Sequence, residues 1–235
     1  MNKRLIVALD VSDLKTAKKL VKTLYPTVEI FKIGSILFTA CGPEAVQVVH
    51  KSGGRVFLDL KFHDIPNTVG RAAQEAGKMG VFMFNIHALG GLKMMSAAVE
   101  AARNAAAVAA KPKPLVLAVT VLTSMDEPDL RQLGILKNAE EQVVYLASLA
   151  RDCGCDGVIC SVEETALVRK KLGSGFVIVT PGIRPAGAGL TDQKRIATPH
   201  NAIEAGVDYI VVGRPIIEAP DPAAAANKIL EEMGV

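Results

Sequence analysis

Eight short apolar runs alternate with segments of helical pattern along the 235 residues, and this alternation limits most strongly how the chain can fold. Most of the runs are rich in Val, Ile and Leu, which is typical of parallel strands covered on both faces. Strand followed by helix, eight times in a chain of this length, predicts an α/β fold of the (β/α)₈ TIM-barrel class. The predicted strands are Leu5–Leu9, Val28–Ile33, Val56–Leu60, Val81–Ile86, Leu115–Leu122, Gly157–Cys160, Phe176–Val179 and Tyr209–Val212.

Helix boundaries between these runs carry sequence signals. Asn138 and Glu141 have capping-box spacing, and Asp221 stands directly before a proline, as at a helix start. A doubly wound open sheet is the alternative, but that fold usually has a glycine-rich fingerprint after its first strand, and Leu9 is not followed by one. Because no shift in composition suggests a linker, we expect residues 1–235 to form a single barrel domain.

Composition excludes several classes of function. The formal charge of +3 is spread along the chain and aromatic residues make up only 4%, so we expect no nucleic-acid surface. No apolar stretch approaches the length of a membrane span, and the first apolar run ends at Asp10, which is too early for a signal peptide. Four cysteines without an extracellular signal indicate a reducing, cytoplasmic setting.

Three of the cysteines lie close together in the sequence, at Cys153, Cys155 and Cys160. Zinc sites usually need four ligands and prefer two to four residues between paired cysteines. The spacing here fits poorly, whereas unpaired cysteine is common as a small buried apolar residue. We therefore expect no metal site.

Charged residues stand where the first three predicted strands end. In order they are Asp10, Lys32, and then Asp59 with Lys61, while Asp64 follows in the predicted loop. Asp59 and Lys61 are two residues apart, so both should project from the same face of a strand. Catalytic residues of TIM barrels lie at this end of the strands, and buried charges are costly unless paired. We expect an active site here; an ion-pair cluster that only plugs the barrel mouth is the alternative.

The order of these charges indicates a kind of reaction. A Schiff-base lysine must be neutral, whereas carboxylates at Asp59 and Asp64 favour the protonated form of Lys61. A lysine ammonium can donate a proton to carbon and stabilise a developing carbanion. The neighbouring carboxylate can oppose a negatively charged group of the substrate. The pattern therefore favours decarboxylation followed by protonation at carbon.

The last two predicted strands suggest a phosphate site. Gly213 and Arg214 follow the eighth strand, where many TIM barrels bind phosphate. Residues 180–193 form a long glycine-containing loop after the seventh strand, which we interpret as a lid. His63 and His87 lie near the charged strand ends, but the sequence leaves their roles open.

At this point the motifs resemble a known family. Asp59-x-Lys61-x-x-Asp64, then Ile-Pro-Asn-Thr68, with Phe-Lys32-Ile-Gly upstream, resembles orotidine 5′-phosphate decarboxylase of the bacterial type. The resemblance covers essentially the whole chain. The Asp-x-Lys-x-x-Asp pattern alone is shared by a wider barrel superfamily, but its combination with Lys32 and the Ile-Pro-Asn-Thr segment is specific. Further matching segments are Ala8–Asp10, Val119–Ser124, Thr180–Arg184 and Val212–Arg214.

The resemblance implies a homodimer that converts orotidine 5′-monophosphate to uridine 5′-monophosphate in pyrimidine biosynthesis, with neither metal nor organic cofactor. It implies that Lys61 delivers the proton and that Asp59 lies against the departing carboxylate. Lys32 and Asp64 would complete the charged array. Asp64 and Thr68 would come from the partner subunit, so that the active sites are shared.

The resemblance also implies the substrate-binding residues. They would be Asp10 and Lys32 at the ribose, Thr123 and Ser124 near the pyrimidine, Gln193, Gly213 and Arg214 at the phosphate, and Arg184 in the closing loop.

Two alternatives remain open from the sequence. A metal-dependent sugar-phosphate decarboxylase or aldolase of the same superfamily would carry an acidic metal ligand in place of Lys32. A non-catalytic barrel that binds nucleotide phosphate would be expected to lack Asp59 or Lys61. The sequence keeps all three residues, which favours the decarboxylase.

Overall fold

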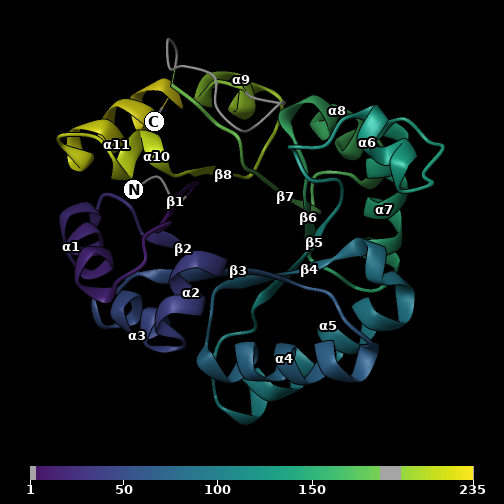
Figure 1. Ribbon diagram of the computed structural model, residues 1–235, viewed down its shortest axis with the longest axis horizontal. Coiled ribbons are helices and arrows are strands. Elements are labelled where there is room, and N and C mark those ends of the chain that lie inside the picture. The colour runs from purple at the N-terminus through teal and green to yellow at the C-terminus, as the bar shows by residue number, and fades with distance from the viewer. Residues whose placement is uncertain (1–3, 186–196, 235) are drawn as a thin grey trace.

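The computed structural model describes residues 4–185 and 197–234, and its eight parallel strands form a closed barrel. Each strand pairs with the next along the chain, and the first pairs with the last, as Ile6 opposite Val211 shows. Figure 1 looks along the barrel and shows the helices around it. The predicted TIM-barrel fold is confirmed.

The strands lie close to their predicted positions. Four boundaries differ by two or three residues. The second and fourth strands begin at Ile30 and Met83 rather than at Val28 and Val81. The third extends to Phe62 rather than Leu60, and the fifth ends at Val119 rather than Leu122. The bounds are β1 Leu5–Ala8, β2 Ile30–Gly34, β3 Arg55–Phe62, β4 Met83–His87, β5 Leu115–Val119, β6 Gly157–Ile159, β7 Val177–Thr180 and β8 Tyr209–Val212.

The helices cover the outside of the barrel (Figure 1). The predicted caps are confirmed, because Asn138 and Glu141 form a capping box and the Asp221 side chain accepts a hydrogen bond from the Ala224 N–H. The bounds are α1 Leu14–Leu24, α2 Ser35–Cys41, α3 Glu44–Lys51, α4 Pro66–Met79, the 3₁₀ helix η1 Ala88–Gly90, α5 Gly91–Val108, α6 Glu127–Gln132, α7 Ala139–Asp152, α8 Val162–Leu172, α9 Pro199–Glu204, α10 Arg214–Ile217 and α11 Pro222–Glu232.

Helices α4 and α5 pack closely against each other. A Cβ atom at Gly77 of α4 would lie 2.4 Å from the backbone oxygen of Ala102 in α5, so only glycine fits this crossing. The contact holds α4 in place beside β3 and β4. The first turn of α4 carries Thr68, directly after the loop that contains Asp64.

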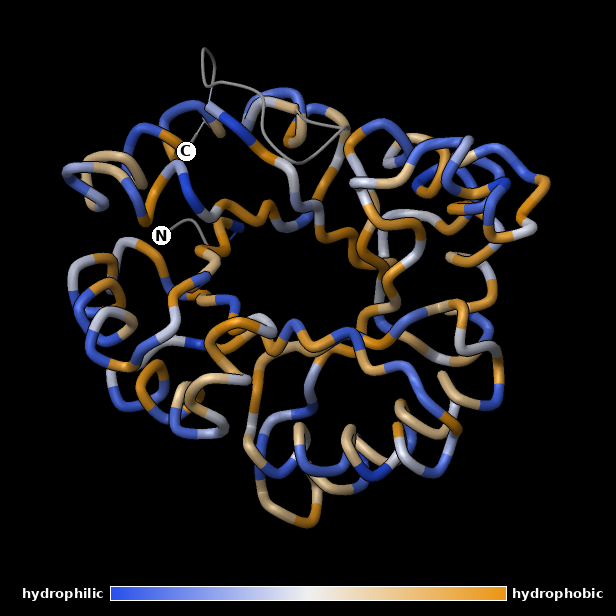
Figure 2. The backbone as a smooth tube through the Cα atoms, viewed as in Figure 1, coloured by the Kyte–Doolittle hydropathy of each residue, from blue (hydrophilic) through white to orange (hydrophobic). Residues whose placement is uncertain are grey.

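Two layers of apolar side chains fill the structure, and hydrophobic residues accordingly dominate the strands in Figure 2. One layer packs between strands and helices, and the other fills the barrel. Ile6, Ala8 and Ile30 belong to the inner layer, whereas Val7 belongs to the outer one. The alternation expected on β1 and β2 is therefore confirmed, and it directs Lys32 towards the barrel mouth.

Candidate active site

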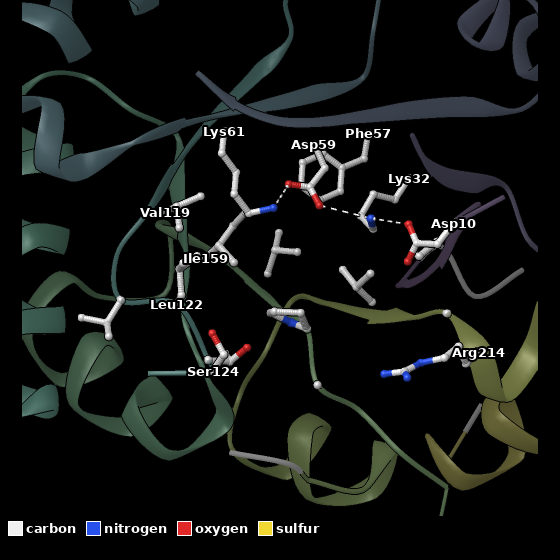
Figure 3. A pocket seen from close by; sticks show the side chains of 18 of the residues that line it. Asp10, Lys32, Phe57, Asp59, Lys61, Val119, Leu122, Ser124, Ile159 and Arg214 are labelled. Atoms are coloured by element: carbon white, nitrogen blue, oxygen red, sulfur yellow. Dashed lines mark hydrogen bonds and ion pairs between the residues drawn. The ribbon is translucent and has the colours of Figure 1, made fainter. Parts of the chain in front are cut away.

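A cavity of about 320 Å³ opens at the carboxyl ends of the strands. Its floor is the top of the inner apolar layer, and charged side chains line its upper walls (Figure 3). Such a site can hold a flat ring against apolar side chains while charges contact its polar edge. The apolar floor consists of Ala8, Phe57, Val119, Ile159, Val179 and Val211.

Four charged side chains of alternating sign form a chain along one wall of the cavity (Figure 3). Lys32 Nζ lies 3.0 Å from Asp10 Oδ1 and 3.2 Å from Asp59 Oδ2. Asp59 Oδ1 lies 2.7 Å from Lys61 Nζ. The side chains of Lys32 and Asp59 are only 12% and 11% exposed. The sequence prediction that these four residues meet at the barrel mouth is confirmed.

The central pair of this chain is charged. Burial by itself raises the pKa of Asp59, but Lys32 and Lys61 outweigh it, so the pKa lies below the usual value. Burial by itself lowers the pKa of Lys32, but Asp59 and Asp10 outweigh it, so the pKa is raised. At neutral pH the cavity therefore presents a carboxylate between two lysines.

A glycine at position 34 leaves space for these charged side chains. A Cβ atom at Gly34 would lie 2.9 Å from Lys32 Nζ and 3.5 Å from Asp10 Oδ1. A larger residue would therefore displace the lysine from its two carboxylates. This explains why a glycine ends β2 beside Lys32.

Strand β3 is irregular where it carries Asp59 and Lys61. Leu58 pairs with Phe84 of β4, but the next registered pair is Phe62 with Ile86, so the register shifts between them. Lys61 has a φ of 51°, in the left-handed region that non-glycine residues seldom adopt. Asp59 and Lys61 thus lie on one strand and their side chains meet, as expected, but the irregularity between them was not predicted.

Asn85 of β4 also belongs to this site, although its sequence context did not single it out. Its side chain is fully buried, donates a 2.6 Å hydrogen bond from Nδ2 to Asp59 Oδ1 and accepts a 2.8 Å hydrogen bond from the Lys61 N–H. The sequence did contain one indication of this role: Asn85 is a single carboxamide within the apolar run of the fourth strand, at a position that faces into the barrel. Such a residue needs partners when buried.

His63 and His87 form a stacked pair beside the cavity, with ring centroids 5.2 Å apart. Burial lowers the pKa of His87 to about 4, and His63 and Lys61 contribute to this shift. His87 is therefore neutral at pH 7. Neither ring is among the residues that line the cavity.

The loops after β5, β7 and β8 hold five of the groups expected at the pyrimidine and the phosphate. Thr123 and Ser124 follow β5, Arg184 follows β7, and Gly213 and Arg214 follow β8, and all five line the cavity. Figure 3 shows Arg214 and Ser124 across the cavity from the Lys–Asp chain. The cavity thus has the Arg214 cation on the side facing the lysines.

Three predicted residues are not among those that line this cavity. Asp64 and Thr68 are exposed and lie outside its walls. Gln193 lies outside the described residues. Asp64 and Thr68 are nevertheless placed on the loop and first helical turn directly after Lys61.

The cysteines take no part in this site. All four are unpaired, and burial raises the pKa of the Cys155 thiol to about 12. Within residues 4–185 and 197–234, no group of His, Cys, Asp and Glu side chains is arranged to hold a metal ion. In the same ranges no helix is long and apolar enough to cross a membrane.

Comparison with known proteins identifies the family. Residues 3–229 match the model of the orotidine 5′-phosphate decarboxylase / HUMPS family. The chain belongs to this family. A relative from Geobacter sulfurreducens, named orotidine 5′-phosphate decarboxylase, is 54% identical over 230 residues, which cover 98% of this chain and 95% of the relative. A relative of the same name from Moorella thermoacetica is 52% identical and covers 98% of this chain and 92% of its own length.

Solved structures of the decarboxylase family agree with this assignment. The crystal structure of orotidine 5′-phosphate decarboxylase from Lactobacillus acidophilus has a TM-score of 0.87 and 38% identity, over 99% of this chain and 100% of that chain. The structure of the enzyme from Pyrococcus horikoshii has a TM-score of 0.76 and 26% identity, over 98% and 99% of the two chains. The family expected from the Asp-x-Lys-x-x-Asp motif is therefore confirmed.

Proposed function

We propose that this protein decarboxylates orotidine 5′-monophosphate to uridine 5′-monophosphate in pyrimidine biosynthesis, with Lys61 as the proton donor. The observation that carries the proposal is the alternating chain Asp10, Lys32, Asp59 and Lys61 on one wall of a cavity whose opposite wall contains Arg214. Membership of the decarboxylase family supports it.

The reaction breaks the bond between the pyrimidine ring carbon and the carboxyl carbon. Carbon dioxide leaves, and the electron pair stays on the ring carbon. The Lys61 ammonium stabilises this negative charge and then transfers a proton to the carbon, and solvent reprotonates the amine. Lys61 Nζ lies 2.7 Å from Asp59 Oδ1, so a substrate carboxylate bound against Asp59 would be next to the proton donor.

The other charged residues position the nucleotide. Asp10 and Lys32 accept and donate hydrogen bonds at the ribose hydroxyls, and their mutual distance of 3.0 Å keeps both at one end of the chain. Arg214 binds the phosphate, because a guanidinium can donate two parallel hydrogen bonds to phosphate oxygens. Gly213, together with Gln193 from the loop after β7, would complete the phosphate site. Arg184 would help the same loop to close.

Thr123 and Ser124 would contact the pyrimidine. Both follow β5 and line the cavity, and the Thr123 side chain is buried. Their hydroxyl groups can donate and accept hydrogen bonds at the carbonyl and N–H groups of the ring edge. The apolar floor excludes water beneath the reacting carbon.

The metal-dependent alternative is disfavoured by the position of Lys32. Its ammonium lies between two carboxylates, at 3.0 and 3.2 Å, and occupies the space that a divalent cation bound by Asp10 and Asp59 would need. A metal there would have to displace a buried lysine. The proposed reaction therefore uses no metal at this position.

Turnover of the nucleotide tests the function directly. We expect loss of the orotate absorbance on adding orotidine 5′-monophosphate, with the same rate before and after exhaustive treatment with a chelator. Activity that disappears with the chelator and returns with magnesium would establish the metal-dependent reaction instead. Binding of the nucleotide without turnover would identify a non-catalytic barrel.

The proposed active form is a homodimer with shared sites. Asp64 and Thr68 are exposed and outside the cavity of their own chain, and the Ile65 side chain between them is 65% exposed. An apolar side chain flanked by functional polar groups suits an interface. Each partner would then supply Asp64 and Thr68 to the other's cavity.

Mixing of subunits tests the shared site. Lys61→Ala and Asp64→Ala homodimers should both be nearly inactive, whereas a mixed dimer regains one site with both natural residues. Random exchange makes half of the dimers mixed, so activity should recover to about a quarter of the unmodified protein. Mixed dimers that are confirmed by mass spectrometry but stay inactive would contradict the shared site.

We also propose that the protein works in the cytoplasm. All four cysteines are present as thiols, and two of them, Cys155 and Cys160, are buried. Free thiols persist in reducing compartments. Fractionation of the source cells, with detection of the protein in the soluble fraction, would test this location.

A further inference from the structure

Asn85 is a buried amide in the middle of the barrel. It lies on β4 between Met83 and His87 on the inner face, and none of its surface is exposed. Met83 belongs to the inner apolar layer. Burying a carboxamide there costs free energy unless its donor and acceptor are both satisfied. The contacts of Asn85 therefore show why an amide occupies the position.

Both ends of this amide contact the Asp59–Lys61 segment. Nδ2 donates to Asp59 Oδ1 at 2.6 Å, the same oxygen that lies 2.7 Å from Lys61 Nζ. Oδ1 accepts from the Lys61 backbone N–H at 2.8 Å. The amide therefore uses its N–H donor for the Asp59 carboxylate and its oxygen acceptor for the Lys61 backbone. A side chain with only a donor or only an acceptor could make only one of these two hydrogen bonds.

The strand pairing explains why a side chain is needed here. Between the pairs Leu58–Phe84 and Phe62–Ile86, three residues of β3 lie opposite the single residue Asn85. The Lys61 N–H consequently donates to the Asn85 side chain instead of a backbone carbonyl of β4. Lys61 has a φ of 51°, and an unusual backbone conformation persists only where its surroundings hold it.

We propose that Asn85 is a positioning residue for proton donation, which sets the backbone of Lys61 and the orientation of the Asp59 carboxylate together. This inference rests on the proposed function and assigns a role to a residue outside the cavity lining. Without the amide, the Lys61 backbone relaxes, and the ammonium moves relative to the reacting carbon. A displacement of about 1 Å can lower a rate about a hundredfold.

Two variants separate the donor and the acceptor of the amide. Asn85→Leu keeps the branching at Cγ and removes both functions. Asn85→Asp keeps the acceptor for the Lys61 N–H but directs a carboxylate oxygen at Asp59. Thr120→Val is the matched control. Thr120 is also buried and donates a 2.8 Å hydrogen bond to the Ile159 carbonyl, but it does not line the cavity.

The expected results distinguish positioning from simple packing. For Asn85→Leu, kcat for orotidine 5′-monophosphate should fall about a hundredfold, while the Kd for uridine 5′-monophosphate changes less than about threefold. Thr120→Val should keep its kcat. For Asn85→Asp, kcat should rise as pH is lowered from 8 to 5.5, because protonation of the introduced carboxyl restores a donor to Asp59. Asn85→Leu should lack this rise.

Several outcomes would overturn the inference. One is turnover by Asn85→Leu within about threefold of the unmodified protein, and another is an Asn85→Asp pH profile equal to that of the unmodified protein. If Asn85→Leu does not fold, the pH profile of Asn85→Asp decides alone. Absence of turnover by the unmodified protein would overturn the proposed function as well, and this outcome is distinct from the others.

Discussion

Replacement of Asp59 by Asn should destabilise the fold, because it removes the carboxylate that separates two lysines. At 3.2 Å and an effective dielectric constant of about 20, each Asp–Lys attraction is of the order of 5 kcal/mol before desolvation is counted. Removing one partner of a buried ion pair typically costs about 3–5 kcal/mol. Lys32 keeps Asp10 at 3.0 Å, and Lys61 is 39% exposed and can hydrate. We therefore expect Asp59→Asn to lower the free energy of unfolding by about 3 kcal/mol, near the lower end of this range.

The pH dependence gives this prediction a second signature. Because the pKa of Asp59 in the folded protein lies below its ordinary value of 3.8, its stabilising contribution is present above that value and is lost as pH falls through the folded pKa. The difference in stability between the two proteins should therefore be constant from about pH 8 to pH 5 and should shrink below about pH 4.

Urea unfolding at one fixed protein concentration measures both effects, since subunit association changes apparent stability. Glu75→Gln is the matched control: its pair with Lys78 is largely exposed, so its loss should stay below about 1 kcal/mol. An Asp59→Asn protein at least as stable as the unmodified one at pH 7 would refute the reasoning. It would mean that repulsion and desolvation around Asp59 outweigh its attraction to the lysines.

Three further predictions concern the site. Lys61→Ala should lower kcat at least about 10⁴-fold with little change in the Kd for uridine 5′-monophosphate, and near-normal turnover would remove Lys61 as proton donor. Arg214→Ala should lower kcat/KM for the nucleotide about a hundredfold but change the slow reaction of the phosphate-free nucleoside less than about threefold, and equal losses would indicate a structural role. The pKa of His87 is depressed to about 4 from 6.5, so stability should fall as pH drops between these values. Because the ring is only partly buried, we expect the free energy of unfolding to fall by about 1–2 kcal/mol, measured by urea unfolding. His87→Phe should reduce this loss, and an unchanged loss in that variant would show that another group causes it.

The sequence was sufficient to predict the barrel and most of the cavity. Apolar runs of strand length fixed where the eight strands lie, because a buried parallel strand needs little else to be recognised. Strand parity then placed Asp10 and Lys32 at the mouth, since Ala8 and Ile30 face inward two residues earlier. The end of the fifth strand was not predictable, because apolar residues continue after Thr120 into the loop that carries Thr123.

The register shift in β3 was not predictable from local sequence. It depends on a hydrogen bond between Lys61 and a side chain 24 residues later, Asn85, which only the pairing of two strands brings together. Secondary-structure propensity gives no sign of a φ of 51° at a lysine. The role of Asn85 and the irregularity at Lys61 were therefore missed for one reason, which is that both depend on a tertiary contact between neighbouring strands.

The pairing of β1 with β8 also determines when during synthesis the nucleotide site is completed. Asp10 is translated near the beginning of the chain and Gly213 near its end, yet a Cβ atom at Gly213 would lie 3.5 Å from Asp10 Oδ2. A ribosome-bound chain that has reached β7 carries the four charges of the mouth but lacks the arginine on the facing wall. A ligand that contacts both Asp10 and the residues after β8 can therefore stabilise only chains in which β1 and β8 have paired.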